Sequence, residues 1–511
     1  MHYVMNKNIR TLFVTTCWKA FAAVLGILLA ASAARADGNV TNQTKSLTLR
    51  ECIDRALENN LEIKSQRIDP AIGSWGIVGA QGVYDPTLSG GINYQDSVTP
   101  EEAGTSTDRL IDRRLQSSGS LNGLLPTGAT YDFSTETTRD TGNFQTISNF
   151  LFTGTAGVSL SQPLLKNFGF GINSANIRIA RESQSIALQT FIQLVMSKIN
   201  DVSTAYYELI FAIENYKSAL ETRALAQQLL DENRKREQVG TMSPLDVIQA
   251  EAGVAESEQT VITTERAIKD NENTLKRLIC QRVTELRGVS LVPVDYPLVQ
   301  MVAIDVDFST NTALEKRADY LSLKHALEKQ NISVQFSRNQ LWPEIDLQGS
   351  YGLNGGARTF NRYTDSLISG DNPVWMVGVA LTVPLGNRAA RANYHIARLD
   401  ADQAVLSLKS LEQDIVVEVD NAVGHVETNL KSVEAARAAT RLAQESLDAE
   451  KKKLLSGTST TFLVLQAQSQ LATSRSLEIR AEADYSESII ALDLAEGTIL
   501  DKNNVVLDEK Y

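Results

Sequence analysis

The chain has 511 residues, of which 22% are charged and 43% hydrophobic, and its formal net charge at pH 7 is −12. This composition is typical of an ordered protein and excludes wholesale disorder. The acidic charge, and the lack of a basic patch with interleaved aromatic residues, argue against a nucleic-acid binder.

The first 36 residues have the pattern of a secretory signal peptide. Basic residues precede an apolar run, 20–34, that is short for a membrane-spanning helix. Small residues at positions 34 and 36 place the cleavage site between Ala36 and Asp37, with an uncleaved anchor as the alternative. Cleavage would remove four Lys/Arg and no Asp/Glu, which takes the net charge from −12 to −16.

Two cysteines, Cys52 and Cys280, would remain in the mature chain. An exported protein enters an oxidising compartment, where a disulfide can form. Two isolated cysteines are, however, more often small buried apolar residues. The sequence leaves both alternatives open.

Four short segments alternate between apolar and small or polar residues, which predicts β-strands. They are 87–94, 152–160, 345–353 and 374–383. Each is about nine or ten residues long, the length of a tilted strand in a membrane barrel. A soluble β-sandwich would show the same alternation, so the pattern alone does not decide between the two.

The first half of the chain carries extra residues between its strands. The distance from Pro86 to Pro163 is 77 positions, whereas that from Pro343 to Pro384 is 41. The extra residues contain a predicted hairpin, 115–123 and 129–135, which would either add strands to the sheet or form an elongated outer loop. We expect the polar insert 96–114 and the segment 354–372 to be exposed loops.

Two long segments, Arg181 to Gly240 and Arg398 to Gly457, each span 59 positions and predict helices. Their apolar residues recur at spacings of four and three, which is typical of a coiled coil. The stripes include Val195, Ile199, Val202, Tyr206 and Leu209 in the first segment, and Leu408, Leu411, Ile415, Val419 and Val426 in the second. Such helices would be about 90 Å long, too long for one compact domain.

Both long segments end in similar stretches: REQVGTMSPLDVIQA at 236–250 and KLLSGTSTTFLVLQA at 453–467. In each, basic residues precede a glycine that is expected to end the helix in a left-handed conformation. Ser243 and Thr460 would then cap returning helices. Each stretch therefore predicts the tip of a helical hairpin.

The matching tips and the equal helix spacings indicate an internal duplication. The expected division is a signal peptide (1–36), a first repeat (37–280), a linker (281–308), a second repeat (309–497) and a C-terminal tail (498–511).

The duplicated plan, the proline-marked strands and the tip pattern V-G-T-x-S-x-x-D-V at 239–247 resemble the TolC-type outer-membrane efflux proteins. The resemblance extends over about residues 46–497. Each single motif is weak, but their order and spacing are specific.

This resemblance implies an α+β membrane protein that assembles as a homotrimer. Each protomer would give strands to a shared outer-membrane β-barrel and helices to a long periplasmic coiled-coil tube. Four strands per protomer would make a barrel of twelve strands, and the extra hairpin would make it eighteen. The implied function is passive conduction of substrates that an inner-membrane transporter and a periplasmic adaptor deliver, without a cofactor.

The resemblance also implies site residues at the tips. Those expected to contact the adaptor are Val239, Gly240, Thr241, Ser243, Gly457 and Thr458. Asp246 corresponds to a residue of the entrance gate, although an acid in the first turn of a helix also has a structural explanation. Leu463 and Gln466 stand where family members carry two aspartates, which puts a cation-binding entrance in doubt.

Other functional classes fit the sequence less well. The only histidines are His2, His325, His395 and His425, and none has metal-ligand spacing with an acid. No glycine-rich phosphate loop follows a strand, so we expect no enzyme, metal or cofactor. A periplasmic coiled-coil adaptor or a structural protein would share the signal peptide and the helices, but would need neither the strands nor the duplication.

Overall fold

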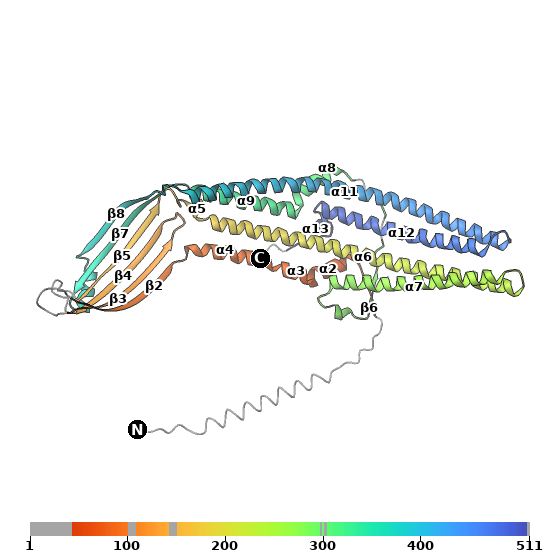
Figure 1. The fold of residues 1–511 in the computed structure, drawn as a ribbon, viewed down its shortest axis with the longest axis horizontal. Coiled ribbons are helices and arrows are strands. Elements are labelled where there is room, and N and C mark those ends of the chain that lie inside the picture. Colours follow the sequence, from red (N-terminus) through yellow and green to blue (C-terminus); the bar gives the residue numbers. More distant parts are fainter. Residues whose placement is uncertain (1–42, 101–108, 143–150, 297–298, 301–303, 508–511) are drawn as a thin grey trace, which may run out of the picture.

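The computed structural model describes residues 43–100, 109–142, 151–296, 299–300 and 304–507. The predicted signal peptide and the cleavage site at Ala36 and Asp37 lie outside these residues. The molecule is elongated, with a β-sheet at one end and two helical hairpin tips at the other (Figure 1).

Six strands form one antiparallel sheet in the order β2-β3-β4-β5-β7-β8. Their bounds are β2 (Thr87–Pro100), β3 (Arg109–Leu124), β4 (Thr130–Gly142), β5 (Phe152–Pro163), β7 (Glu344–Ala357) and β8 (Pro373–Thr382). The four segments predicted as strands form β2, β5, β7 and β8, which confirms them. The predicted hairpin forms parts of β3 and β4, so it adds two strands to the sheet and is not an outer loop.

The prediction that 96–114 is an exposed polar loop was wrong for the described part of that insert. Residues 96–100 belong to β2 and residues 109–114 belong to β3, and the two strands pair as far as Pro100 and Arg109. Opposite charges face each other across this extension, with Arg113 Nε 3.2 Å from Asp96 Oδ2. Cross-strand ion pairs of this kind stabilise two antiparallel strands without apolar alternation. The alternation pattern therefore did not predict this part of the strands.

Two helices run the length of the helical part: α6 (Ala175–Gln238, 64 residues) and α11 (Arg388–Leu455, 68 residues). At 1.5 Å per residue each is about 100 Å long. Shorter helices lie against them, α4 (Ile68–Gln81) and α9 (Ala318–Asn339) near the sheet, and α7 (Pro244–Ile279) and α12 (Thr461–Ala495) towards the tips. No helix of the described chain combines the length and the apolar character needed to cross a membrane.

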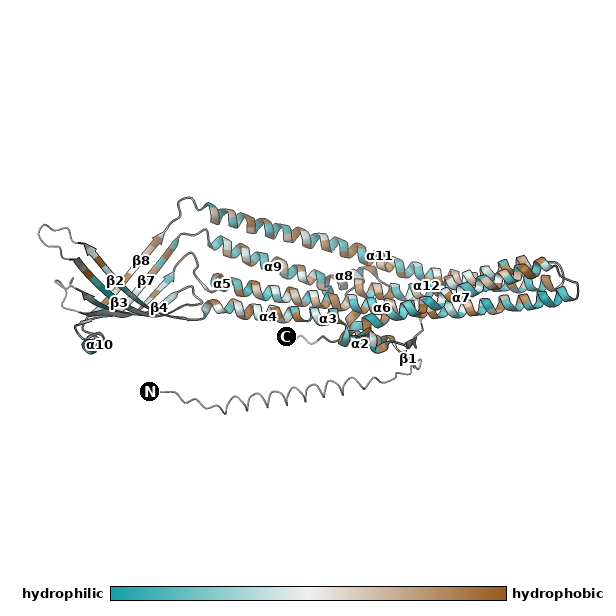
Figure 2. Ribbon diagram, turned by 60° about the horizontal axis from the view of Figure 1, so that its bottom comes forward, coloured by the Kyte–Doolittle hydropathy of each residue, from teal (hydrophilic) through white to brown (hydrophobic). Residues whose placement is uncertain are grey.

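The contacts between helices arrange them in one layer. Near the sheet the order is α4-α6-α9-α11, and towards the tips it is α7-α6-α12-α11. The predicted stripes form the seams of this layer: Val195, Ile199 and Tyr206 are buried on α6, as are Ile415 and Val419 on α11. Figure 2 shows the resulting mixture of apolar and polar residues along these helices.

Small elements gather around the middle of the helices. They are β1 (Gln43–Leu47), which pairs in parallel with β6 (Val289–Pro293), and helices α2 (Leu49–Asn59), α3 (Leu61–Gln66), α8 (Val306–Lys316) and α13 (Ile499–Lys502). Helices α5 (Phe170–Asn173) and α10 (Phe360–Ile368) and the short η1 (Gly82–Tyr84) and η2 (Val283–Leu286) complete the described elements.

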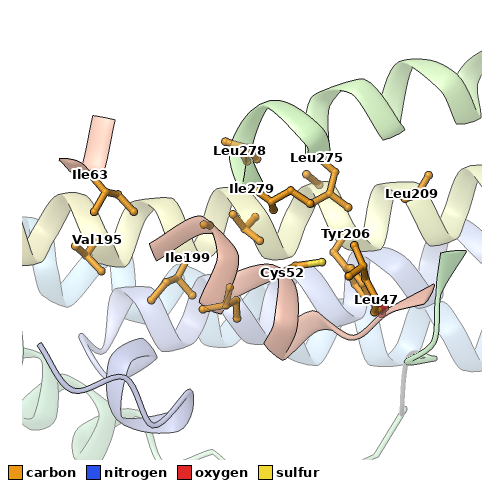
Figure 3. Packing of buried hydrophobic residues seen from close by; sticks show 14 of the residues in the cluster. Leu47, Cys52, Ile63, Val195, Ile199, Tyr206, Leu209, Leu275, Leu278 and Ile279 are labelled. Carbon is orange, nitrogen blue, oxygen red and sulfur yellow. The ribbon is translucent and has the colours of Figure 1, made fainter. Parts of the chain in front are cut away.

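Both cysteines lie in the core around these small elements. Cys52 of α2 is fully buried beside Leu47 and Tyr206, and Cys280 packs at the edge of the same cluster (Figure 3). Burial raises the pKa of the Cys52 thiol to about 12. Both are free thiols in the structure, as expected for small buried apolar residues.

Candidate functional site

One face of the sheet is apolar and exposed. The strand register places one apolar residue of every strand in a single row, Leu88–Leu121–Phe133–Val158–Tyr351–Trp375. Trp375 and Val377 of β8 are 72% and 70% exposed. Exposed residues of the same face include Ile92, Tyr94, Leu115, Leu160, Leu347, Val379 and Leu381. An apolar face of this extent marks a surface that contacts a membrane or another protein.

The opposite face of the sheet is polar. The neighbouring row reads Ser89–Ser120–Ser134–Gly157–Gly352–Val374, and the hydroxyls of Ser89 and Ser120 lie 2.7 Å apart. Two hollows of about 610 and 330 Å³ lie along this face. They are lined by residues that include Asp132, Glu136, Thr155, Ser159, Gln348 and Ser350. The sheet is therefore built to separate an apolar environment from an aqueous one.

The two hairpin tips have the same backbone geometry. Gly240 and Gly457 follow α6 and α11, and both have φ of 76°. The N–H of Thr241 donates to the Arg236 carbonyl at 2.9 Å, and that of Thr458 donates to the Lys453 carbonyl at 3.0 Å. These bonds close the helix ends as a Schellman motif does, with the glycine in the left-handed region.

The returning helices begin with the predicted caps. Ser243 Oγ accepts a hydrogen bond from Leu245 N at 3.2 Å, and Thr460 Oγ1 accepts one from Leu463 N at 3.4 Å. Each bond satisfies one of the unpaired N–H groups at a helix start. The loops between α6 and α7 and between α11 and α12 lie together at the end of the molecule farthest from the sheet (Figure 1). They carry the residues predicted to contact a partner: Val239, Gly240, Thr241, Ser243, Gly457 and Thr458.

The tips pack against each other and form one unit. Leu229 of α6 packs with Leu447 and Leu454 of α11 and with Val464 of α12. Arg236 Nη1 donates to the Leu454 carbonyl at 3.3 Å, so the first hairpin also bonds the end of the second long helix. The position of one tip is therefore coupled to that of the other.

All three residues predicted for an entrance gate lie on the returning helices. Leu463 and Gln466 of α12 are exposed, whereas Asp246 of α7 is half-buried. Gln466 lies with Gln249 of α7, its counterpart in the first repeat, in a groove of about 860 Å³ that α6, α7 and α12 line. The structure thus brings the returning helices of the two repeats together along this groove, although Leu463 and Asp246 do not line it.

A second groove, of about 680 Å³, lies between α6, α11 and α12 and was not found from the sequence. Glu487 of α12 lines it, and its Oε1 atom is buried without a hydrogen-bond partner. Burial, and then the nearby Glu208 carboxylate, raise the pKa of Glu487 to about 7. Arg480 connects the helices beside it, with Nη1 2.6 Å from Glu208 Oε1 of α6. The groove is missed in the sequence because its residues come from three separate helices.

The histidines have ordinary structural environments. Nδ1 of His325 in α9 lies 2.8 Å from Glu182 Oε2 of α6, and His425 of α11 lines the second groove. In the part of the chain that the structure describes, no group of three or more His, Cys, Asp or Glu side chains could hold a metal ion.

Comparisons with known proteins agree with this geometry. A sequence profile described as "Outer membrane efflux protein" matches residues 127–281 and 310–498. The chain is 24% identical over 480 residues to outer membrane efflux protein BepC of Brucella suis, an alignment that covers 92% of this chain and 90% of the relative. It is 23% identical over 359 residues to outer membrane protein TolC of Vibrio cholerae, covering 68% of this chain and 77% of the relative. The CmeC outer membrane channel of Campylobacter jejuni has a similar fold, with a TM-score of 0.65, 17% identity and 90% of each chain covered.

Proposed function

The chain belongs to the outer membrane efflux protein family, and from this premise we propose that it is the outer-membrane exit duct of a tripartite efflux or type I secretion system. The observation that carries the proposal is the six-stranded sheet with one apolar and one polar face, continued by helices about 100 Å long. A bilayer would contact the apolar face, and water and substrate the polar face. A periplasmic adaptor or a structural protein has no use for such a sheet.

The open edges of the protomer support a homotrimer. Within the described chain β2 and β8 are the edge strands, and each has one side without a strand partner. Pairing β8 of one copy with β2 of the next would remove all edges once the ring closes, which a strand edge in lipid requires. Three protomers with six strands each would form a barrel of eighteen strands, within the range of bacterial barrels.

The edge helices support the same assembly. Exposed apolar residues recur along one side of α4, at Ile68, Ile72 and Trp75, and along α11, at Leu399 and Leu406. Each helix forms one edge of the layer near the sheet. In a ring of copies these two stripes would face each other and be buried.

The tips are the proposed docking site for the periplasmic adaptor. All the residues expected to contact it are exposed: Val239, Gly240, Thr241, Ser243, Gly457 and Thr458. A partner that binds these tips would contact the same backbone geometry twice per protomer, once in each repeat. The adaptor in turn would connect the duct to an inner-membrane transporter that supplies the energy.

The entrance to the duct is proposed to lie just inside the tips. Asp246 and Leu463 belong to the first turns of the returning helices and Gln466 to the second turn of α12, where a ring of three protomers would be narrowest. A leucine and a glutamine provide no acidic ring, so the entrance would not bind cations strongly.

The proposal is tested by reconstituting the mature protein in planar bilayers and recording conductance. A duct gives discrete channel openings, whereas an adaptor or a structural protein gives none. Adaptor docking is tested separately by co-purification with the Gly457→Glu variant, which places charge and a strained residue at the tip. Normal recovery of the adaptor with this variant would refute the tip as the docking site.

A further inference from the structure

Helix α10 packs on the apolar face of the sheet, at the end farthest from the long helices. Tyr363 of α10 is buried, and its hydroxyl lies 2.8 Å from Thr137 Oγ1 of β4. Thr137 pairs with Gly154 of β5, which pairs with Gly355 of β7 in turn, so all three residues point to the same face as the apolar row. The contact therefore identifies the face that α10 covers.

Two glycines make room for this helix. A Cβ atom at Gly154 would collide with the hydroxyl of Tyr363, and one at Gly355 would lie 3.1 Å from Leu367 Cβ. Larger residues at either position would lift α10 off the sheet. The two glycines thus leave space for a helix on this part of the sheet.

The outer side of α10 exposes apolar and charged side chains. Ile368 and Phe360 are 79% and 54% exposed, and Arg362 and Asp365 are exposed between them in the sequence. Arg139 of β4 lies beside the helix, with its guanidinium 5.6 Å from the centre of the Phe152 ring. Phe152 in turn packs against Phe360, with 5.8 Å between ring centres. Aromatic, apolar and charged groups therefore lie on α10 and on the strand beside it.

Helix α10 covers the part of the sheet where the apolar face begins to carry charged side chains. Moving away from the long helices, the first charged side chains on this face are Arg139 and the Asp96–Arg113 pair. From Ile345 to Ala357 of β7 the strand covers about 40 Å, or about 30 Å along the normal of a membrane that it crosses at the usual tilt. This is the thickness of the hydrocarbon core of a bilayer, so α10 would lie at its boundary.

We propose that α10 is an interfacial helix that binds the anionic headgroups of lipids in the outer leaflet, with Arg139 and Arg362 holding their phosphate groups. The proposal rests on the membrane orientation given under the proposed function. Amphipathic helices with apolar and basic residues lie in this interface, and arginine binds phosphate well because its donors match the oxygen geometry. The two exposed arginines and the continuity with the apolar face identify lipid as the occupant.

The test measures lipid binding by the intact mature protein in detergent, with native mass spectrometry and phosphatidylglycerol as the probe. The Arg139→Gln/Arg362→Gln variant should bind phosphatidylglycerol about thirtyfold more weakly, since each arginine near an anionic lipid surface strengthens binding by roughly a factor of five. The matched control is Arg266→Gln/Arg441→Gln, which removes one exposed arginine from α7 and one from α11 and should bind as the wild type does. The Arg139→Lys/Arg362→Lys variant keeps the charge and should retain most of the binding.

Three results would overturn the inference. Equal binding of phosphatidylglycerol by the wild type and the double glutamine variant would remove the role of the two arginines. Equal binding of phosphatidylglycerol and phosphatidylcholine by the wild type would exclude headgroup charge. Competition by inorganic phosphate at the same concentration would show a site for the free anion. In all three cases the wild type still inserts into phosphatidylcholine vesicles; failure to insert would instead contradict the proposed function itself.

Discussion

Gly240 and Gly457 lie 217 positions apart and occupy the same point of their hairpins, each with φ of 76°. A left-handed conformation costs any residue with a Cβ atom about 1 kcal/mol. The space around both glycines is open, so the backbone conformation alone explains the choice of residue.

We therefore expect Gly240→Ala and Gly457→Ala each to lower the free energy of unfolding by about 1 kcal/mol. Gly424→Ala is the control, because Gly424 lies exposed within α11 with open space around it. Alanine favours a helix interior, so this change should raise stability by about 0.5–1 kcal/mol. Denaturant unfolding of the three variants measures the change in the free energy of unfolding. A similar change in all three would refute the tip geometry.

A buried ion pair fixes the end of α7 to β6. Lys276 Nζ lies 3.1 Å from Glu272 Oε2, and Glu272 Oε1 also accepts from Leu291 N at 3.0 Å. Lys276→Met leaves the Glu272 charge buried without its partner, so we expect a loss of about 3–5 kcal/mol in the free energy of unfolding.

The double variant Lys276→Met/Glu272→Met is the control for this prediction. It removes both charges but leaves Leu291 N without its acceptor, so we expect a smaller loss of about 1–3 kcal/mol. A double variant less stable than Lys276→Met would show that the charge of Glu272 is not the cause.

The raised pKa of Glu487, about 7 against 4.5 for the unfolded chain, predicts a pH dependence. Between these values the folded state binds more protons than the unfolded state, so the free energy of unfolding should fall as the pH rises from about 5 to 7. The expected contribution is roughly 2–3 kcal/mol. Glu208 and Asp484 strengthen the effect and Arg480 weakens it.

Glu487→Gln should remove this part of the pH dependence and stabilise the protein above pH 7. Glu445→Gln, an exposed change on α11, should leave the wild-type slope intact. Thermal unfolding across the pH range compares the three proteins. An unchanged slope in Glu487→Gln would assign the pH dependence to another group.

A substitution of Asp246 tests whether this residue holds the entrance closed. Its carboxylate makes no hydrogen bond or ion pair with the described part of the chain, and it lies in the first turn of α7 beside the tip. Asp246→Ala should lower stability by about 0.5 kcal/mol through the helix dipole. If Asp246 also holds the entrance closed, cells carrying the variant should admit a large antibiotic more readily. Unchanged entry and unchanged thermal stability together would exclude both roles.

Much of the fold follows from patterns within single segments. The stripe that includes Val195 and Ile199 predicts α6, and the left-handed glycines with the caps at Ser243 and Thr460 predict both tips. Strand alternation around Trp375 predicts the apolar face as well. These features are local, since helix period, capping and strand alternation depend on residues close in sequence.

The features that escaped prediction depend on residues far apart in the chain. Helix α10 lies in a segment that we expected to be an exposed loop, and its position depends on Gly154 and Gly355 in two other strands. The groove around Glu487 needs three helices to form it. An ion pair between Asp96 and Arg113 holds the strand extensions together, and a pattern of hydrophobic residues cannot predict such a pair.

The measurement that tests the central claim most directly is the native mass of the mature protein after detergent extraction of outer membranes. We expect a trimer in that fraction, because only a closed ring of protomers removes the open edges of β2 and β8. A monomer in the soluble periplasmic fraction would contradict it, since the apolar face of the sheet would then have no membrane to contact.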